Sequence, residues 1–340
     1  MTDNMKGCSS MTPIVPVLLI FFRRRCVLEV LCRIRAYAPD QLFLVADGGR
    51  NPVEHAQCLE VRRLVEAAID WPCQVERLYS DTNLGCRGNI PRGISWVFSH
   101  VDRAIILEDD TVPNADFFAF CSEMLQYYAD DHRVMTISGA NFCTVHSESS
   151  DFSYVFSGYS ETTGYATWAR AWHLYDPEMR LWPVAKGIGL LESSFLAPLE
   201  RIYWHKIFEE VWDRTCTCDP YDYQWLFASW VNNGLSIVPR SNLITNIGSG
   251  AEATHTHDVA CRLLDRPVQG LDWPLKHPPV VVRSAVFDVN YGRFMFYGEP
   301  KTFWHRLRTR IVIALPNPIR SCLRAVRSMV NGQWSRISKN

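Results

Sequence analysis

Short apolar runs alternate with longer segments of helical periodicity over the first part of the chain. Apolar runs bounded by polar residues are typical of buried strands, and they predict strands at Pro16–Phe22, Leu42–Ala46, Cys73–Tyr79, Arg103–Leu107 and Val134–Ser138. Apolar residues three and four apart predict helices at Cys26–Ile34, Glu54–Ile69, Pro91–Phe98 and Ala115–Tyr128, with a turn at Asn83–Gly88. This alternation predicts an α/β fold: a doubly wound, Rossmann-like mixed sheet, parallel in this half, with helices on both faces.

The second half is rich in tryptophan and tyrosine and lacks this alternation. Its patterns predict helices at Thr167–Tyr175, Leu199–Arg214 and Tyr221–Asn232, a strand at Ser236–Val238, and loop over 245–280. We expect both halves to share one continuous sheet, with a soft boundary near residue 145. The predicted units are a disordered leader at residues 1–12, the two halves at 13–145 and 146–300, and a tail at 301–340.

Composition narrows the class of protein. A chain of 340 residues with 47% hydrophobic residues can bury a sizeable core, and no apolar run reaches the roughly 20 residues of a membrane-spanning helix. Thr12–Phe22 is short and lacks a small-residue cleavage site, so we do not expect a signal peptide. The 12 cysteines are scattered, which favours free core thiols in a reducing cytoplasm over a disulfide framework.

The net charge of −1 hides an asymmetry between the body and the tail. Residues 301–340 carry nine Lys and Arg and no acidic residue, whereas residues 1–300 carry 26 basic against 36 acidic side chains, a balance of −10. This body is not expected to bind nucleic acid. In the tail, apolar residues recur three and four apart on either side of Pro316-Asn317-Pro318. Two basic amphipathic helices of this kind would lie peripherally on an anionic membrane surface at its cytoplasmic face, or would pack on the body with their arginines in water.

Three acidic residues, Glu108, Asp109 and Asp110, directly follow the apolar run Ala104–Leu107. Carboxylates at the carboxyl end of a buried strand lie where open α/β sheets bind ligands. Adjacent carboxylates repel one another unless a cation joins them, and Mg²⁺ or Mn²⁺ is the expected partner. The alternative is an acidic turn on the surface.

Further polar residues follow the first two strands. Arg23, Arg24 and Arg25 come after the first and suit a nucleotide phosphate or base; Asp47 closes the second and can accept from ribose or base. The alternatives are a charged helix start and an Asp turn before Gly-Gly. A Gly-x-Gly-x-x-Gly motif does not follow the first strand, which argues against a nicotinamide enzyme, and no Gly-Lys-Ser motif is present.

Asp222 and two histidines are the candidate reactive groups of the second half. Asp222 opens a predicted helix among three aromatic residues, and shielding by rings can raise a carboxyl pKa towards that of a useful general base. Alternatively it complements the helix dipole. His255 and His257 lie in a predicted loop, where one would contact a phosphate or the metal unless both are surface residues.

From Glu108 to Phe118 the chain resembles the donor-site motif of inverting glycosyltransferases of the N-acetylglucosaminyltransferase I type, which have the GT-A fold. The resemblance continues in order over roughly residues 14–260, and the same group includes bacterial proteins labelled hemolytic-protein-like or sugar transferases. The further matching segments are Arg24, Asp47, Asn83-Leu84-Gly85 with the Gly93–Phe98 helix, Gly164-Tyr165 up to Trp172, Tyr221–Trp225 and Pro239–Gly248. Tyr165 and Tyr221 stand where the family has tryptophan, and an arginine-rich turn replaces its Asn-Arg-Pro.

The resemblance implies transfer of a sugar, with inversion, from a nucleoside-diphosphate sugar, expected to be UDP-linked, to a hydroxyl of a glycan or lipid-linked acceptor. It implies that Asp110, with His255, holds Mn²⁺ or Mg²⁺ and that Asp222 is the catalytic base. The implied nucleotide-sugar contacts are Arg24, Asp47, Arg87, Glu108 and Asp109, and the implied acceptor-side residues are Tyr165 and Trp168.

Two other classes of function fit the same residues. A metal-dependent nucleotidyltransferase or phosphohydrolase would use the same carboxylates, although a Gly-rich, Lys-containing signature is absent after the first strand. A GT-A scaffold without catalysis, acting as a binding module or a membrane-damaging protein, would not need both the acidic motif and Asp222.

Overall fold

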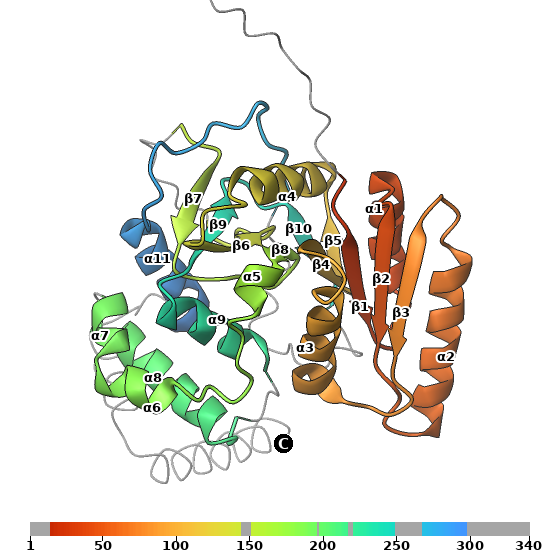
Figure 1. Cartoon of the computed structure of the whole chain (residues 1–340), viewed down its shortest axis with the longest axis horizontal. Coiled ribbons are helices and arrows are strands. Elements are labelled where there is room, and N and C mark those ends of the chain that lie inside the picture. Colours follow the sequence, from red (N-terminus) through yellow and green to blue (C-terminus); the bar gives the residue numbers. More distant parts are fainter. Residues whose placement is uncertain (1–13, 144–150, 196, 217–219, 249–266, 298–340) are drawn as a thin grey trace, which may run out of the picture.

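The computed structural model describes residues 14–143, 151–195, 197–216, 220–248 and 267–297 of the chain. The predicted leader and tail, and His255 and His257, lie outside these residues. Figure 1 shows the arrangement of the described elements. The strands are β1 (Val17–Phe21), β2 (Gln41–Ala46), β3 (Gln74–Tyr79), β4 (Arg103–Glu108), β5 (Thr111–Pro113), β6 (Val134–Ser138), β7 (Tyr154–Ser157), β8 (Tyr165–Trp168), β9 (Leu235–Pro239) and β10 (Ile244–Asn246).

Helices connect and cover these strands. They are α1 (Val27–Tyr37), α2 (Pro52–Ala67), α3 (Gly85–Val97), α4 (Ala115–Tyr127), α5 (Ala169–Trp172), α6 (Trp182–Gly187), α7 (Leu190–Ser194), α8 (Pro198–Trp212), α9 (Asp222–Val231), α11 (Ala285–Gly292) and the π-helix η1 (Arg293–Tyr297).

One sheet of eight strands runs through both halves in the order β3-β2-β1-β4-β8-β6-β9-β7. β1 pairs in parallel with β2 and β4, whereas β8 is antiparallel to β4 and β6, and β7 is antiparallel to β9. A separate pair, β10 with β5, is antiparallel. The predicted α/β class with a doubly wound mixed sheet is therefore confirmed, and so is the expectation that the halves share one sheet.

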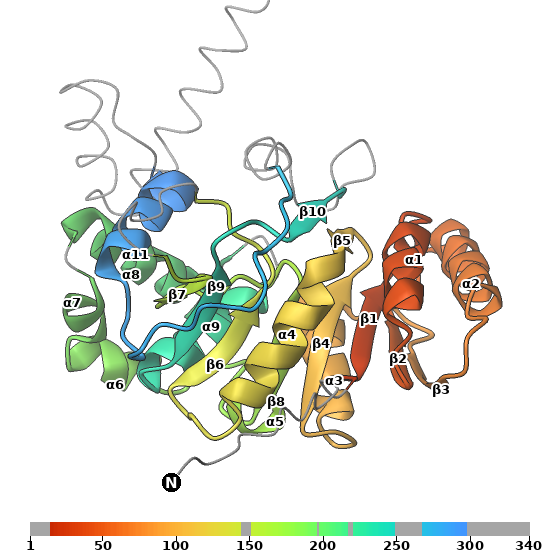
Figure 2. The same cartoon turned by 90° about the horizontal axis from the view of Figure 1, so that it is seen from above.

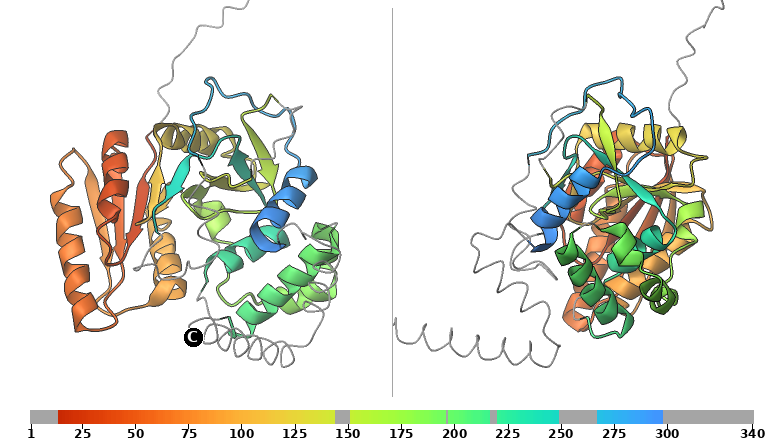
Figure 3. Two further views of the ribbon diagram at one scale, coloured as in Figure 1. Left: turned by 180° about the vertical axis from the view of Figure 1, so that it is seen from behind. Right: turned by 90° about the vertical axis from the view of Figure 1, so that its left-hand side faces the viewer.

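Helices cover both faces of this sheet because its inner strands β1, β2, β4 and β6 are apolar on both faces. All five residues of β1 are buried; Leu19 packs with α1, α2 and α4, and its neighbours Leu18 and Ile20 pack with α3, α5 and α9. Figure 2 shows α4 crossing the sheet on the first of these faces. A third, aromatic cluster lies under α6, α7, α8 and α11, at the end of the molecule away from β3 (Figure 3).

Local structure departs from the predicted elements in two places that matter for the site. α3 begins at Gly85 rather than Pro91, so the predicted turn at Asn83–Gly88 is largely helical and Pro91 lies inside the helix. Tyr165–Trp168 is a strand, so the predicted helix from Thr167 begins only at Ala169. β5, β7, β10, α6, α7 and α11 were not predicted.

The cysteines only partly follow the sequence-based expectation. Of the eight cysteines in the described residues, Cys58, Cys121 and Cys143 are buried as expected of core thiols. Cys32, however, is exposed, and Cys26 directly precedes α1 at its N-cap position.

Candidate active site

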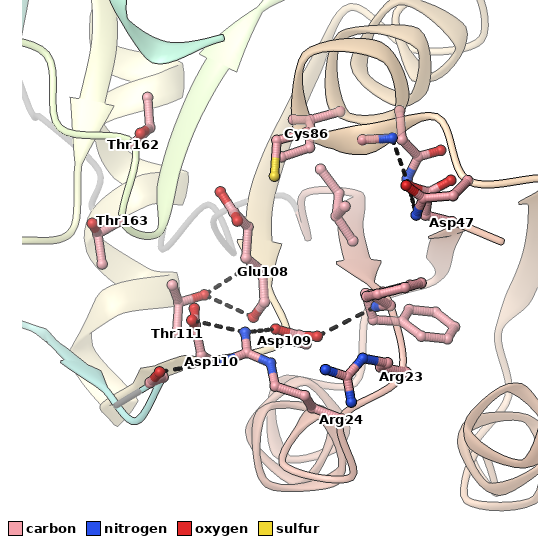
Figure 4. A pocket seen from close by; sticks show the side chains of 18 of the residues that line it. Arg23, Arg24, Asp47, Cys86, Glu108, Asp109, Asp110, Thr111, Thr162 and Thr163 are labelled. Atoms are coloured by element: carbon pink, nitrogen blue, oxygen red, sulfur yellow. Dashed lines mark hydrogen bonds and ion pairs between the residues drawn. The ribbon is translucent and has the colours of Figure 1, made fainter. Parts of the chain in front are cut away.

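A pocket of about 400 Å³ lies at the carboxyl ends of β1, β2 and β4 (Figure 4). Its position follows from the winding of the sheet. From β1 the chain passes through α1 to β2 on one side, and it returns through α3 to β4 on the other. Since α1 and α3 cover opposite faces, the loops beyond β1 and β4 diverge and leave a crevice between them.

The acidic run at the end of β4 meets an arginine from the end of β1. The Arg24 guanidinium donates through Nη2 to Asp109 and, at 2.9 Å, to Asp110 Oδ2. The backbone N–H of Phe22 donates to Asp109 Oδ2 at 3.3 Å. Burial raises the pKa of Asp109 to about 6, although the charge of Arg24 opposes this. The strand ends are thus joined by an ion pair that borders the pocket.

Asp47 organises the start of α3. Its Oδ1 accepts from the backbone N–H groups of Gly48 and Leu84 at 2.9 and 2.8 Å, and its Oδ2 accepts from Gly85 N and Asn83 Nδ2, both at 3.0 Å. Because these bonds hold the first N–H groups of α3, the helix begins here despite Pro91. Asp47 lines the pocket, and each of its two oxygens accepts two bonds within the protein; its contact with ribose or base stays a prediction.

A second group of carboxylates lies where α9 meets the end of β4. The Tyr221 hydroxyl donates to Glu108 Oε1 at 3.2 Å, and Asp222 is the first residue of α9. Burial, with the charges of Asp110 and Asp109, raises the pKa of Glu108 to about 8. Burial also raises the pKa of Glu161 to about 8, and the nearby charge of Asp222 adds to this. Tyr221 therefore ties the second half to the acidic run, with Asp222 beside it.

Glu161 gives a prediction of pH-dependent stability. Its carboxyl binds a proton more tightly in the folded chain than in the unfolded chain, so it makes the free energy of unfolding fall as pH rises from about 4.5 to about 8. Glu161→Gln removes the buried charge. We expect its melting temperature to exceed that of the wild type by a few degrees at pH 8.5 and to match it at pH 4, as measured by circular dichroism. A constant difference across this range would contradict the assignment.

Tyr165 and Trp168 point to opposite sides of the sheet, although a helix would have placed them one turn apart on one face. Tyr165 packs on the α3 and α9 side near Tyr221 and Glu108. Trp168 is 4% exposed and donates from Nε1 to the Leu125 carbonyl on the other side, under α4. Three residues along a strand reverse the direction of the side chain. Both side chains are therefore buried in the core on opposite faces of the sheet, and Tyr165 is the one that lies near Glu108.

One further predicted residue in the described part of the chain, Arg87, is not brought to the pocket. Arg87 donates from Nη2 to the Pro177 carbonyl at 3.0 Å and does not line the pocket. His255 lies outside the described residues. Arg25 pairs with Glu60 on the surface, so of the three consecutive arginines Arg23 and Arg24 line the pocket.

The pocket also contains residues that the sequence did not single out. Asn89 on α3 is 3% exposed, and its Oδ1 has no hydrogen-bond partner among the described residues. Thr162 and Thr163 border the opposite wall, from the loop before β8. Asn246 and Gly248 close the pocket beside Asp110. The threonine loop carries no sequence pattern that would have pointed to it.

A divalent cation that arrives with phosphates would need one or two carboxylate ligands at this pocket. In the part of the chain that the structure describes, no group of three or more His, Cys, Asp or Glu side chains is arranged to hold a metal ion. Mg²⁺ is commonly held by one or two carboxylates together with substrate phosphates. Asp110, whose side chain is 19% exposed, is the carboxylate placed for this, and Gly248 lies so close that a Cβ there would overlap its Oδ2.

Within the described residues, none of the helices is both long and apolar enough to cross a membrane.

No family model matches the chain, and no curated protein matches it. Among solved structures, it is similar to a 4-diphosphocytidyl-2C-methyl-D-erythritol synthase from Anaerococcus prevotii DSM 20548 and to mouse xyloside xylosyltransferase 1. The first is 9% identical over 65% of this chain and 99% of that chain, with a TM-score of 0.29. The second is 9% identical over 63% and 81%, with a TM-score of 0.31. Both scores are low, and the description of the fold rests on the chain's own topology.

Proposed function

We propose that the chain is a metal-dependent, inverting glycosyltransferase that moves a sugar from a nucleoside-diphosphate sugar, UDP-linked, to a hydroxyl of a glycan or lipid-linked acceptor. The observation that supports this best is the nearness of two groups at the end of β4: Glu108 lines the pocket, and the charge of Asp222 adds to burial and the neighbouring aspartates in raising the pKa of Glu108. Arg24 and the acidic run stand at the strand ends, and Asp222 stands beside Tyr221, which is bonded to Glu108. This is the order of parts expected from the resemblance to the N-acetylglucosaminyltransferase I type.

In the proposed reaction the chain supplies charge on one side of the sugar and a base on the other. Asp110 would hold the cation, which when bound offsets charge on the leaving diphosphate. Asp222 would take the proton of the acceptor hydroxyl. In the same step the acceptor oxygen would bond to the anomeric carbon as the bond from that carbon to the phosphate oxygen breaks. Tyr221, through its bond to Glu108, would hold Asp222 in place. A single displacement of this kind inverts the anomeric carbon.

The test is a screen of nucleotide sugars with Mn²⁺, read by thermal shift and by release of the nucleoside diphosphate. A transferase should be stabilised by one donor and should hydrolyse it slowly without acceptor. A binding module would be stabilised without release of product, whereas a nucleotidyltransferase would release pyrophosphate from a nucleoside triphosphate and a sugar phosphate. Failure of every nucleotide to raise the melting temperature would contradict the proposal.

Asn89 provides a prediction for donor binding. A buried oxygen without a partner, in a residue that lines a pocket, is expected to accept a hydrogen bond from the ligand. Asn89→Ala should therefore raise KM for the donor roughly 3- to 10-fold, the worth of one hydrogen bond. The measurement is donor hydrolysis against donor concentration. Arg92→Ala, an exposed change on the same helix, is the control, and equal effects of both changes would contradict the role.

The basic tail at residues 301–340 is proposed to attach the enzyme to an anionic membrane surface. Each Lys or Arg near such a surface adds about 1 kcal/mol, and the tail carries nine. Deleting residues 301–340 should leave donor hydrolysis intact and release the protein from liposomes that contain anionic lipid, as measured by cosedimentation. If the truncated protein unfolds, the tail packs on the body instead.

A further inference from the structure

Arg24 pairs with both Asp109 and Asp110, the second of which is the proposed metal ligand. Its guanidinium bridges Asp109 and Asp110 through one nitrogen, Nη2, while Nη1 lies 3.5 Å from the Gly248 carbonyl. The Arg24 side chain is only 17% exposed. Figure 4 shows it reaching from the end of β1 across to the acidic run. The chain thus already carries one cation at the position expected for the metal.

The two carboxylates differ in how firmly they are held. Asp109 is 7% exposed in its side chain, and its oxygens accept from both Arg24 and the Phe22 backbone. Asp110 is 19% exposed, and within the described residues its carboxylate accepts from Arg24 alone. Asp109 is therefore the fixed anchor of Arg24, and Asp110 is the partner that Arg24 can release.

Charge decides when this release is favourable. A divalent ion on Asp110 would lie a few ångströms from the guanidinium, where like charges repel strongly because the site is partly buried. An ion that binds without nucleotide must therefore displace Arg24 from Asp110. No anion is then present to pair with the released guanidinium. A nucleoside diphosphate brings anionic oxygens that match a guanidinium, so Arg24 can exchange Asp110 for a phosphate in the same step.

We infer that Arg24 is a built-in competitor of the metal, which makes cation binding depend on the nucleotide. The inference rests on the proposed function for the nature of the nucleotide. Without donor, Arg24 neutralises Asp110 and keeps the site closed to cations. With a nucleoside diphosphate, Arg24 pairs with phosphate and Asp110 becomes a metal ligand. Arg24 is a positioning residue in this scheme, and the order of binding follows from it.

The experiment measures Mn²⁺ binding to the full chain without nucleotide, by the loss of the free-ion signal in electron paramagnetic resonance. Arg24→Gln removes the charge and keeps a hydrogen-bond donor, and it should bind Mn²⁺ about 10-fold more tightly than the wild type, a typical coupling between sites. Arg24→Lys keeps the charge and should stay within about threefold of the wild type. Asp110→Asn added to Arg24→Gln should abolish the gain. A folded Arg24→Gln protein with unchanged Mn²⁺ affinity would overturn the inference.

A second measurement holds even if Arg24→Gln does not fold. In wild-type protein labelled with ¹⁵N-arginine, the side-chain signal of Arg24, assigned by its loss in Arg24→Lys, should shift with Mg²⁺ and UDP together and not with Mg²⁺ alone. A shift with Mg²⁺ alone, or no shift when bound UDP raises the melting temperature, would overturn the inference. Absence of any UDP binding would instead refute the proposed donor, and the Mn²⁺ comparison would still decide the role of Arg24.

Discussion

Asp110→Asn is expected to abolish sugar transfer and metal-dependent donor binding while leaving the fold intact. Loss of a charged ligand removes the cation that offsets charge on the leaving diphosphate, and this stabilisation is worth several kcal/mol. We expect kcat/KM to fall by about 10³-fold. The fold should survive because Asp109 still pairs with Arg24 and holds the ends of β1 and β4 together. The measurement is donor turnover at saturating Mn²⁺, with circular dichroism as the check of folding.

The matched control is Asp102→Asn, an exposed carboxylate just before β4, at the opposite end of the same strand. It should leave kcat/KM within the error of the assay. Two results would refute the role of Asp110: near-normal activity of the wild type in EDTA, or near-normal activity of Asp110→Asn at the same Mn²⁺ concentration.

Most of the sheet of the first half was predictable because β1, β2, β4 and β6 are short apolar runs buried on both faces. β1, β2, β4 and β6 lie within one or two residues of their predicted bounds, and the position of the acidic run at a strand end followed from them. α3 was misjudged because its start is set by Asp47, which lies 38 residues before Gly85. Helix propensity alone favours a start of α3 at Pro91, whereas hydrogen bonds to Asp47 set the start at Gly85.

The second half was less predictable because its elements depend on partners far away in sequence. β8 inserts between β4 and β6 as an antiparallel strand, and its aromatic sequence Tyr165–Trp168 fits a buried strand as well as a helix. Only the pairing decides between them, and it also decides that Trp168 faces the core. The short helices α6 and α7 carry too few turns for a clear period.

The residues of the candidate site also differ in whether the sequence could predict them. Glu108, Asp109 and Arg24 could be predicted because strand ends meet at one edge of a sheet. The closing residues could not, because Thr162 and Thr163 lie in a loop without periodicity. Asp47 was predicted at the correct edge, but its four hydrogen bonds assign it to the loop that starts α3. A carboxylate at a strand end can thus serve the backbone as well as a ligand.

Asp222→Asn is expected to lower kcat by about 10²–10⁴-fold, the usual contribution of a general base. Asparagine has nearly the same shape but cannot accept the proton. Donor binding should survive, because Arg24, Asp109 and Asp110 belong to the other half of the site, so KM for the donor should change little. Tyr221→Phe is the companion variant. It removes the hydroxyl that bonds Glu108 and should lower kcat less, because the base itself remains.

The split between kcat and KM decides what Asp222 does. If Asp222 only stabilised the start of α9 through the helix dipole, Asp222→Asn would lower the free energy of unfolding by a fraction of a kcal/mol. Turnover per folded molecule would not change. A base must instead lower turnover at saturating donor and acceptor without lowering the melting temperature in proportion. If Asp222→Asn lowers donor affinity and leaves kcat intact, Asp222 is a donor contact. Glu161, whose pKa is raised by burial and by the nearby charge of Asp222, then becomes the carboxylate to test as the base.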